Sequence, residues 1–358
     1  MSVSHSARPS PLFPLGPGQW IGKCEIRRLL GRGTLAEVYR AFSPELSADV
    51  AVKVLRPPTK EGSEAAVEAR FQRVVGAISR LHHPNIARIY DFGLDGGRLF
   101  ILMELVEGPS LRDMLSARRG AFPLDQAMTI FRQVAEAINY AHTQDIVHED
   151  LRPGNVLLAE GTRPVVADFG LRRVLGEDDL TTVELSPRAP TYMSPEQASG
   201  RGVSKQTDIY SLGVMLYEMV TGDVPFRGDS ATRILVQHMQ AVPRPPSELN
   251  VEVPPRVEAA ILRALAKTPG ERFPSALDMV EALVPPPTQD DYDTVTLSRE
   301  GAKDIRQQLH AAVDEVAPPI EVETPHHVTH SDILLLVAVA VVMIVIVVII
   351  TLLSRGLF

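Results

Sequence analysis

The stretch HEDLRPGNVLL (residues 148–158), followed by ADFG (167–170), decides the fold expected for this chain. Asp150 and Asn155 are five positions apart on a turn-rich segment that leads into an apolar strand, and Asp168 follows a second apolar run. Side-chain oxygens delivered from two adjacent loops suit the coordination of Mg²⁺. A carboxylate at Asp150 is also able to accept a proton from a hydroxyl group. The two loops therefore indicate a magnesium site beside a proton acceptor.

A glycine-rich turn and a strand that contains a lysine lie upstream of these loops. In GRGTLAEV (31–38), Gly31 and Gly33 allow the backbone to approach a phosphate group and to direct N–H groups at it. Lys53 lies within the apolar run VAVKVL (50–55), where its burial is costly without an anionic partner. These features predict a phosphate-binding site. The simpler alternative is a hairpin followed by an edge-strand lysine whose ammonium group reaches water.

The remaining patterns divide residues 19–284 into a strand-rich part and a helix-rich part. Strand-like runs such as LFILMEL (99–105) dominate the first third of this region. The remainder is mostly helical by pattern, as in 125–143 and 208–221. We expect an α+β fold in which a small β-rich lobe precedes a larger α-rich lobe. A cleft should lie between the two lobes, with 102–108 as the hinge.

Six motifs occur in order along this region: the glycine-rich turn, VAVK, H-x-D-x-x-x-x-N, DFG, SPE (194–196) and DIYSLG (208–213). Each motif is weak evidence alone, but together they make chance negligible. Residues 19–284 resemble the protein kinase family, and most closely the bacterial serine/threonine kinases. The resemblance implies a two-lobed kinase fold that binds ATP and Mg²⁺ and phosphorylates Ser or Thr hydroxyls of proteins. It also implies an ion pair between Glu196 and Arg272.

The resemblance assigns a role to each matching position. Lys53 would bind the α- and β-phosphates of ATP, and Asp150 would be the catalytic base. Arg152 stands where related kinases have a lysine that reaches the transferring phosphate. Asn155 and Asp168 would hold Mg²⁺, with Mn²⁺ as an alternative ion. The expected nucleotide-binding residues are Gly31, Gly33, Val38, Ala51, Lys53, Met103, Glu104, Val106 and Leu157.

One departure from the family pattern concerns the partner of the strand lysine. Relatives pair this lysine with a helix glutamate, and the matching position in the helix expected over 63–81 is Val74. Glu68 is six positions away, off the same helical face. We therefore expect Lys53 to lack that partner and to pair with Asp168 when no nucleotide is bound. The loss of a buried partner costs roughly 3–5 kcal/mol, which sets an upper bound on the catalytic defect.

Other departures lie around the segment that follows DFG. Glu149 stands where many kinases have an arginine that receives an activating phosphate, so phosphorylation of Thr181 or Thr182 would lack its usual receiver. Ala189 has no hydroxyl group to bind the catalytic aspartate, and Thr191 is an imperfect substitute. As a hypothesis, Glu149 locks the segment by pairing with one of three arginines, Arg172, Arg173 or Arg188.

Two functions remain open on these residues, with a third less favoured. The retained Lys53, Asp150, Asn155 and Asp168 favour an active serine/threonine kinase whose activity is weak or atypically regulated. The departures favour a pseudokinase, meaning a nucleotide-binding or partner-binding signalling scaffold with negligible phosphotransfer. A phosphotransferase that acts on a small molecule is disfavoured by the SPE and DIYSLG segments. The sequence names neither a substrate nor a signalling partner.

The run ILLLVAVAVVMIVIVVIITLL (333–353) predicts a single transmembrane helix. These 21 residues include no charge and would span about 31 Å as a helix. A kinase domain needs cytosolic ATP, so we expect a single-pass protein of the cell membrane with its kinase domain in the cytoplasm. The five residues that follow, 354–358, would form a short tail on the far side or within the membrane interface.

The flanking segments and the overall charge complete the expected organisation. Residues 285–332 carry ten acidic and three basic residues and several prolines, which predicts an acidic juxtamembrane spacer. Residues 1–18 contain four prolines and read as a flexible tail. The net charge of −8 argues against a protein built to bind nucleic acid. Cys24, the only cysteine, excludes an internal disulfide and a cysteine zinc cluster.

Overall fold

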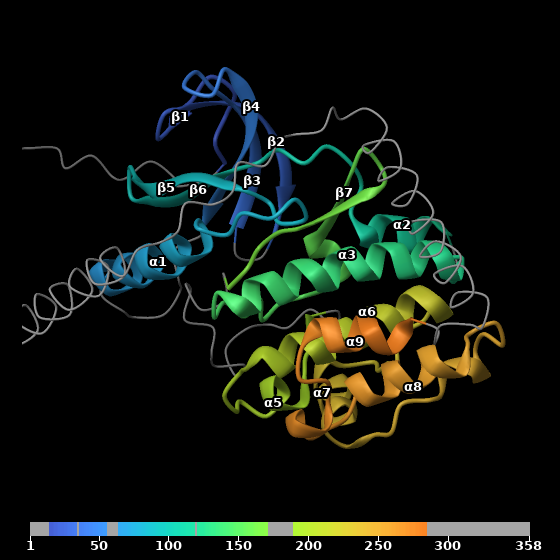
Figure 1. The fold of residues 1–358 in the computed structure, drawn as a ribbon. Coiled ribbons are helices and arrows are strands. Elements are labelled where there is room, and N and C mark those ends of the chain that lie inside the picture. The colour runs from blue at the N-terminus through green and yellow to red at the C-terminus, as the bar shows by residue number, and fades with distance from the viewer. Residues whose placement is uncertain (1–13, 34–35, 56–63, 119, 171–188, 285–358) are drawn as a thin grey trace, which may run out of the picture. The chain divides into compact units, whose positions relative to one another are not determined.

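A computed structural model describes residues 14–33, 36–55, 64–118, 120–170 and 189–284, all within the compact unit Met1–Pro285 (Figure 1). The predicted spacer (285–332), transmembrane segment (333–353) and tail (354–358) lie outside these residues. Within the described ranges, no helix combines the length and apolarity that a bilayer crossing requires. The predicted two-lobed α+β architecture is confirmed for the part of the chain that the structure describes.

The N-terminal lobe is built on one antiparallel sheet in the order β1-β2-β3-β4-β6-β5. Its strands are β1 (Trp20–Ile21), β2 (Cys24–Arg32), β3 (Ala36–Ser43), β4 (Ala48–Leu55), β5 (Ile89–Asp95) and β6 (Arg98–Met103). The predicted strands at 50–55 and 99–105 correspond to β4 and β6. Strand β6 ends at Met103, so the last two residues of the predicted run belong to the connection between the lobes.

The sheet curls so that residues near its two edge strands meet. The backbone N–H of Gly22, which follows β1, donates to the Asp95 carboxylate of β5 at 2.7 Å. Gly22 has φ +54°, and a Cβ on it would lie 2.7 Å from the Phe100 ring. Glycine is therefore the residue that fits this close approach. The curled sheet encloses the apolar core of the lobe.

A short segment ahead of residue 19, the predicted start of the domain, contacts the N-terminal lobe. Leu15 is buried in the core cluster of the sheet, together with Tyr39 and Phe100. Its backbone N–H donates to the Tyr39 hydroxyl at 3.0 Å. Residues 14–18 thus pack onto the lobe, because a leucine within the proline-rich segment finds an apolar site there.

Helix α1 (Glu64–Ile78) packs against the sheet and lies beside β5 and β6 (Figure 1). Its buried residues Phe71 and Val75 join a cluster with Ile101 and Met103. The Phe71 ring meets the Phe92 ring edge to face at 5.9 Å. The helix predicted over 63–81 is confirmed, although it ends three residues earlier.

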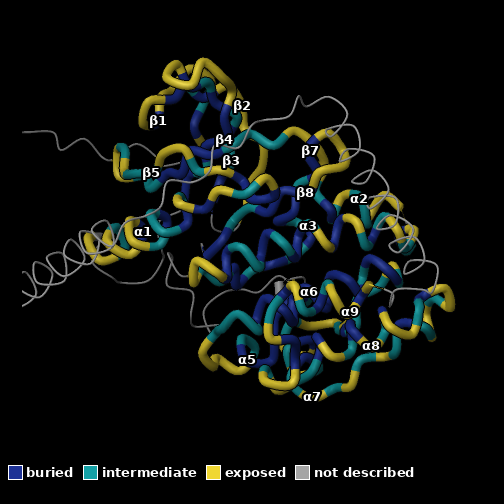
Figure 2. The backbone as a smooth tube through the Cα atoms, in the orientation of Figure 1, coloured by how far each residue is buried: buried dark blue, intermediate teal, exposed yellow. Residues whose placement is uncertain are grey.

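The C-terminal lobe is mostly helical around a second, larger core (Figure 2). Helix α6 (Lys205–Thr221) is almost wholly buried, and α3 (Leu124–Thr143) packs one face against it. A short hairpin, β7 (Val156–Ala159) and β8 (Arg163–Val166), lies near α2 (Leu111–Arg118). The other helices are η1 (Pro153–Asn155), η2 (Ala189–Tyr192), α5 (Pro195–Ala198), α7 (Ala231–Gln240), η3 (Pro246–Glu248), α8 (Pro255–Ala264), η4 (Pro269–Glu271) and α9 (Ala276–Leu283).

Candidate active site

Asp208 of α6 holds the backbone of the HEDLRPGN loop. Its carboxylate accepts hydrogen bonds from the backbone N–H groups of His148, at 2.8 Å, and Glu149, at 3.0 Å. His142 of α3 approaches the same carboxylate through Nε2 at 2.7 Å. Asp208 is fully buried, so its charge depends on these partners. The loop is therefore tied to the two central helices of the lobe.

His148 extends this frame to the DFG segment. Its carbonyl accepts the Gly170 N–H at 3.1 Å, and its ring nitrogen Nε2 lies 3.0 Å from the Ala167 carbonyl oxygen. The His148 and Phe169 rings pack with their centroids 4.5 Å apart. The Ala167 N–H donates to the Asn155 carbonyl at 2.9 Å, which gives a second link. The two loops singled out from the sequence are thus fixed side by side.

Asp150 lies among the residues that the sequence grouped with it. The Asn155 amide Nδ2 donates to the Asp150 carbonyl at 2.8 Å and to its carboxylate at 3.1 Å. The Arg152 guanidinium lies 3.2 Å from the same carboxylate. Because Nδ2 is committed to Asp150, the side-chain oxygen of Asn155 is the atom left to bind a cation. The Asp150 side chain remains partly exposed.

Lys53 and Asp168 form the contact between the lobes at the centre of the site. The Lys53 Nζ lies 2.6 Å from the Asp168 carboxylate, and the two side chains are 12% and 27% exposed. Burial works against ionisation of Asp168, but the charge and hydrogen bond of Lys53 outweigh it and lower the pKa of the carboxyl group. Asp168 has φ +70°, an unusual backbone conformation for a residue other than glycine.

Val74 lies on α1 near Gly170, two residues after Asp168. Its Cγ1 is 3.5 Å from the position that a Cβ on Gly170 would occupy, so it faces the DFG segment. It also packs against the apolar clusters of both lobes. An apolar side chain therefore occupies the place where the sequence comparison expected a glutamate. The predicted pairing of Lys53 with Asp168 is observed.

The predicted nucleotide residues converge on the sheet and the connection between the lobes. Val38 of β3 pairs with Lys53 of β4, and Ala51 pairs with Met103 of β6. Gly31 pairs with Val38 from β2, and Leu157 lies in β7 on the opposite lobe. The remaining predicted residues are Gly33, which follows β2, and Glu104 and Val106, which follow β6. Their roles in nucleotide binding stay predictions.

The connection between the lobes is fixed by main-chain contacts. The Glu104 N–H donates to the Arg88 carbonyl at 2.8 Å, and its carboxylate accepts the Arg88 N–H at 3.3 Å. Gly108 has φ +155°, and a Cβ there would collide with the Leu158 carbonyl. The Leu158 N–H in turn donates to Pro109 at 2.9 Å. This close approach joins the predicted hinge to β7.

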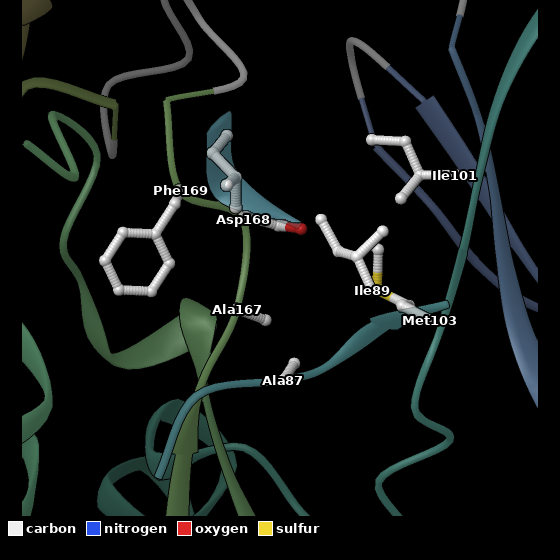
Figure 3. A pocket seen from close by; sticks show the side chains of 8 residues that line it. Ala87, Ile89, Ile101, Met103, Ala167, Asp168 and Phe169 are labelled. Carbon is white, nitrogen blue, oxygen red and sulfur yellow. The ribbon is translucent and has the colours of Figure 1, made fainter. Parts of the chain in front are cut away.

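A small pocket lies behind Met103 (Figure 3). Its volume of about 20 Å³ has room for roughly one water molecule. Figure 3 shows the Asp168 carboxylate and the Phe169 ring pointing in opposite directions. The lining residues come from both lobes: Ile78, Ala87, Ile89, Ile101, Met103, Ala167, Asp168 and Phe169. Except for Asp168, the lining is apolar.

The predicted ion pair between Glu196 and Arg272 is confirmed. Two guanidinium nitrogens donate to the two carboxylate oxygens, each at 2.8 Å, and both side chains are buried. Arg272 also donates to three backbone carbonyls, and the Thr207 hydroxyl donates to Glu196. A buried charge pair with this many partners anchors the SPE segment to the lobe.

Some functional residues were not found from the sequence alone. Asp208 was noticed only as part of a motif, and His142 and Gln197 were not singled out. The Gln197 amide donates to the Glu149 carbonyl at 2.7 Å. One sequence feature could have pointed to Asp208: it is a charged residue in the largely apolar run that continues as IYSLG. A charge buried there would need hydrogen-bond partners.

Other predictions fall outside the residues that the structure describes. Residues 171–188 are among these, so Thr181, Thr182 and the three arginines proposed to pair with Glu149 are not placed. Glu149 itself is buried, with φ +70°. Ala189 begins η2.

The donor set around Asp168 and Asn155 fits a cation bound together with phosphates. Within the described ranges, no group of three or more His, Cys, Asp or Glu residues is arranged to hold a metal ion. Mg²⁺ in nucleotide sites takes one or two carboxylates plus phosphate oxygens, so a complete protein cage is not required. One carboxylate and one amide oxygen are consistent with that arrangement.

A curled β-sheet lobe and a helical lobe, joined through Lys53 and Asp168, define a protein kinase domain. The chain belongs to the protein kinase family: residues 24–284 match the family model described as "Protein kinase domain". The fold is similar to the crystal structure of the PknI kinase domain of Mycobacterium tuberculosis, with a TM-score of 0.62 and 28% identity. That match covers 75% of this chain and 98% of the PknI domain.

Curated relatives are named as bacterial serine/threonine-protein kinases. The chain is 41% identical to PksC of Streptomyces coelicolor over 264 residues, which cover 71% of this chain and 47% of PksC. It is 38% identical to PrkC of Bacillus subtilis, with 72% and 39% covered. It is 36% identical to PknB of Mycolicibacterium smegmatis, with 73% and 42% covered. The match therefore spans less than half the length of each of these relatives.

Proposed function

We propose that this protein is an ATP-dependent serine/threonine protein kinase. The observation that carries the proposal is the meeting of four side chains in one site. Asn155 Nδ2 lies 3.1 Å from the Asp150 carboxylate, and Lys53 Nζ lies 2.6 Å from Asp168. These residues come from both lobes and from three separate segments. The names of the curated relatives support the same activity.

The chemistry proposed for these residues is a direct transfer of the γ-phosphoryl group. The hydroxyl oxygen of a Ser or Thr attacks the γ-phosphorus, the bond to the β-phosphate oxygen breaks, and ADP leaves. Asp150 orients the hydroxyl and accepts its proton. Lys53 binds the α- and β-phosphates, and Arg152 lies near the transferred group. Asn155 and Asp168 would hold Mg²⁺, which neutralises phosphate charge when it is bound.

A second candidate, a pseudokinase scaffold, is favoured by Val74. Without a glutamate at this position, Lys53 is held by Asp168, a residue needed for Mg²⁺. For a nucleotide to bind, this ion pair must break, so that Lys53 can contact the phosphates and Asp168 can bind the metal ion. If this exchange is unfavourable, the domain binds partners without transferring phosphate.

The organisation around the kinase domain is also a proposal. The kinase domain is proposed to extend to Val284, followed by an acidic spacer over 285–332. Ile333–Leu353 is proposed to cross the cell membrane once, which keeps the kinase domain in the cytoplasm, where ATP is available. The support is the 21-residue apolar run, whose helical length matches the hydrocarbon thickness. Protein substrates are expected, and nucleic acid is not.

The test of activity uses the full chain in detergent micelles with MgATP. Phosphate incorporation into the chain or a general protein substrate is measured alongside the thermal shift produced by nucleotide. The control is Asp150→Asn, which removes the proton acceptor but retains a similar shape. Incorporation that disappears in this control supports the kinase. A nucleotide-induced shift without incorporation supports the scaffold. No response to nucleotide contradicts both the kinase and a scaffold that binds nucleotide.

A further inference from the structure

A buried carboxylate lies at the base of the glycine-rich turn. Glu37 is the second residue of β3, and its side chain is only 2% exposed. It pairs across the hairpin with Arg32, the last residue of β2, which lies between Gly31 and Gly33. Next to this pair, the Gly33 N–H donates to the Ala36 carbonyl at 2.8 Å. Glu37 therefore occupies a position from which the base of the turn can be held.

Two contacts connect Glu37 to the turn and to the core of the lobe. The Arg32 Nε lies 3.2 Å from Glu37 Oε1, and the Tyr39 hydroxyl donates to Glu37 Oε2. Burial raises the pKa of Tyr39, and the hydrogen bond to Glu37 raises it further, so the hydroxyl keeps its proton and acts as a donor. A carboxylate buried in this way requires such partners.

The Tyr39 hydroxyl also binds the segment that precedes β1. It accepts the backbone N–H of Leu15 at 3.0 Å. The Leu15 side chain is buried in the same apolar cluster as the Tyr39 ring, so both the main chain and the side chain of this leucine hold the segment in place. A chain of contacts therefore runs from the N-terminal segment, at Leu15, to the glycine-rich turn, at Arg32.

This chain of contacts lies on the face of the sheet opposite the proposed nucleotide site. Successive residues of a strand point to opposite faces, so Glu37 and Tyr39 share one face and Val38 lies on the other. Val38 is paired with Lys53, the residue expected to bind the phosphates. Glu37 can therefore act on a nucleotide only indirectly. Holding the N–H groups of the turn in place before a phosphate arrives lowers the cost of ordering them on binding.

We infer that Glu37 is a positioning residue for nucleotide binding, which acts through Arg32 on the glycine-rich turn. Tyr39 and the segment around Leu15 hold Glu37 in place. The inference rests on the proposed kinase function and adds a means of regulation to it: displacement of the N-terminal segment weakens ATP binding without any change in the site itself. The effect should fall on the KM for ATP rather than on kcat, because the catalytic loop belongs to the other lobe.

The first measurement is the affinity of the full chain for MgATP, by calorimetric titration in detergent micelles. Arg32→Gln and Tyr39→Phe break the chain of contacts on either side of Glu37, and each should raise Kd about tenfold. Because both substitutions act through Glu37, the double variant should bind no more weakly than the weaker single variant. Independent effects would multiply to about a hundredfold. Arg32→Lys, which keeps the charge, should retain most of the affinity.

The matched control is Arg27→Gln. It removes an exposed arginine from the same strand as Arg32, one that is paired with Glu25 at 3.0 Å. Its Kd for MgATP should equal that of the unmodified protein. An equal loss of affinity in Arg27→Gln and Arg32→Gln would show that any arginine of β2 contributes in this way, which would contradict the role assigned to Glu37.

Thermal unfolding without nucleotide separates positioning from a merely structural role. Tyr39→Phe should lower the melting temperature, because Leu15 N–H and the Glu37 carboxylate lose a buried partner. Arg32→Gln changes a half-exposed side chain and should have little effect on the melting temperature. It therefore keeps the inference testable even if Tyr39→Phe folds poorly. Arg32→Gln with an unchanged Kd for MgATP overturns the inference.

Leu15→Asn tests the far end of the chain of contacts. A polar side chain is costly to bury in the apolar cluster, so the N-terminal segment should leave its site there. In the incorporation assay the KM for ATP should rise about fivefold while kcat changes by less than about twofold. The same substitution added to Tyr39→Phe should have no further effect. A rise in KM that persists in that background, or an equal fall in kcat, rejects the connection to the N-terminal segment.

Binding and phosphate transfer are measured separately, so the two proposals can fail separately. MgATP affinity that depends on Arg32 and Tyr39, with no incorporation, supports the positioning role of Glu37 and rejects the kinase. Incorporation with the same Kd in every variant retains the kinase and rejects the positioning role. No MgATP binding by the unmodified chain rejects both.

Discussion

The two halves of the candidate active site are held in different ways. In the C-terminal lobe, Asp208 fixes the catalytic loop through two backbone N–H groups and lies 2.7 Å from His142. In the N-terminal lobe, Lys53 reaches the site through one ion pair with Asp168, and Val74 faces Gly170 of the same DFG segment. Several buried hydrogen bonds hold the C-terminal half of the site. The N-terminal half depends on a single ion pair, which a bound nucleotide would have to replace.

This difference shows where a kinase domain tolerates departures from its family pattern. A residue such as Asp208 cannot be replaced alone, because the buried groups that it binds would be left without hydrogen-bond partners. A residue on α1 can change from a glutamate to valine because the helix also packs through apolar side chains such as Phe71 and Val75. We therefore expect substitutions at Asp208 and its partners to affect folding, and substitutions on α1 to affect mainly the rate of phosphate transfer.

Asp208→Ala is expected to have the largest effect. It removes an acceptor from two buried backbone N–H groups and a partner from His142, which should cost about 3–5 kcal/mol of unfolding free energy and abolish phosphate incorporation. Chemical denaturation and incorporation assays measure the two effects. Asp229→Ala, which removes an exposed aspartate paired with Arg233, should change stability by less than about 1 kcal/mol. Similar losses of unfolding free energy in both variants would contradict the proposed role of Asp208.

Gly108→Ala should be the next largest in effect. The added methyl group would collide with the Leu158 carbonyl in a backbone conformation that alanine rarely adopts. We expect a loss of roughly 2 kcal/mol or more in stability and weaker nucleotide binding, because the hinge and β7 must separate. Calorimetric titration with MgATP measures the affinity. Gly202→Ala, where a Cβ meets open space, is the control and should change neither quantity.

Val74→Glu tests the weaker half of the site directly. A carboxylate at this position should compete with Asp168 for Lys53 and leave Asp168 to the metal, which raises the rate of incorporation by about tenfold. Val74→Gln provides a similar shape without charge and should not raise the rate. A glutamate variant that loses stability with no gain in rate would show that Lys53 does not reach position 74.

The smallest expected effect is a change in how the free energy of unfolding depends on pH. His238 is buried against Tyr210, whose hydroxyl lies 2.8 Å from Nδ1. Burial lowers the pKa of His238 to about 3, with the charge of Lys267 as a further cause. Below pH 6.5 the unfolded chain binds a proton that the folded chain does not, so stability falls as the pH decreases.

His238→Gln should lower the melting temperature at pH 7.5 but make its decline toward pH 5 less steep. The matched control is His82→Gln, at an exposed histidine, which should leave the slope unchanged. Parallel curves for the unmodified protein and His238→Gln would contradict the assignment.

Much of the fold was predictable because its signals are local. The predicted helix over 125–143 is observed at Leu124–Thr143, and the strand over 50–55 lies within Ala48–Leu55. Their apolar periodicity follows from the face that each element buries. The burial of Leu15 was not predicted, because it depends on a site formed by Tyr39 and Phe100, which no local pattern reveals.

The sequence by itself determined the family, the expected catalytic residues and the absence of a glutamate at position 74. These depend on residue identity and spacing, which can be read along one chain. Only the tertiary structure decided that Asp208 carries the catalytic loop, that Lys53 pairs with Asp168, and that the Leu15 N–H donates to Tyr39. Such contacts join segments far apart in sequence, and their energies depend on burial and on partners that packing alone brings together.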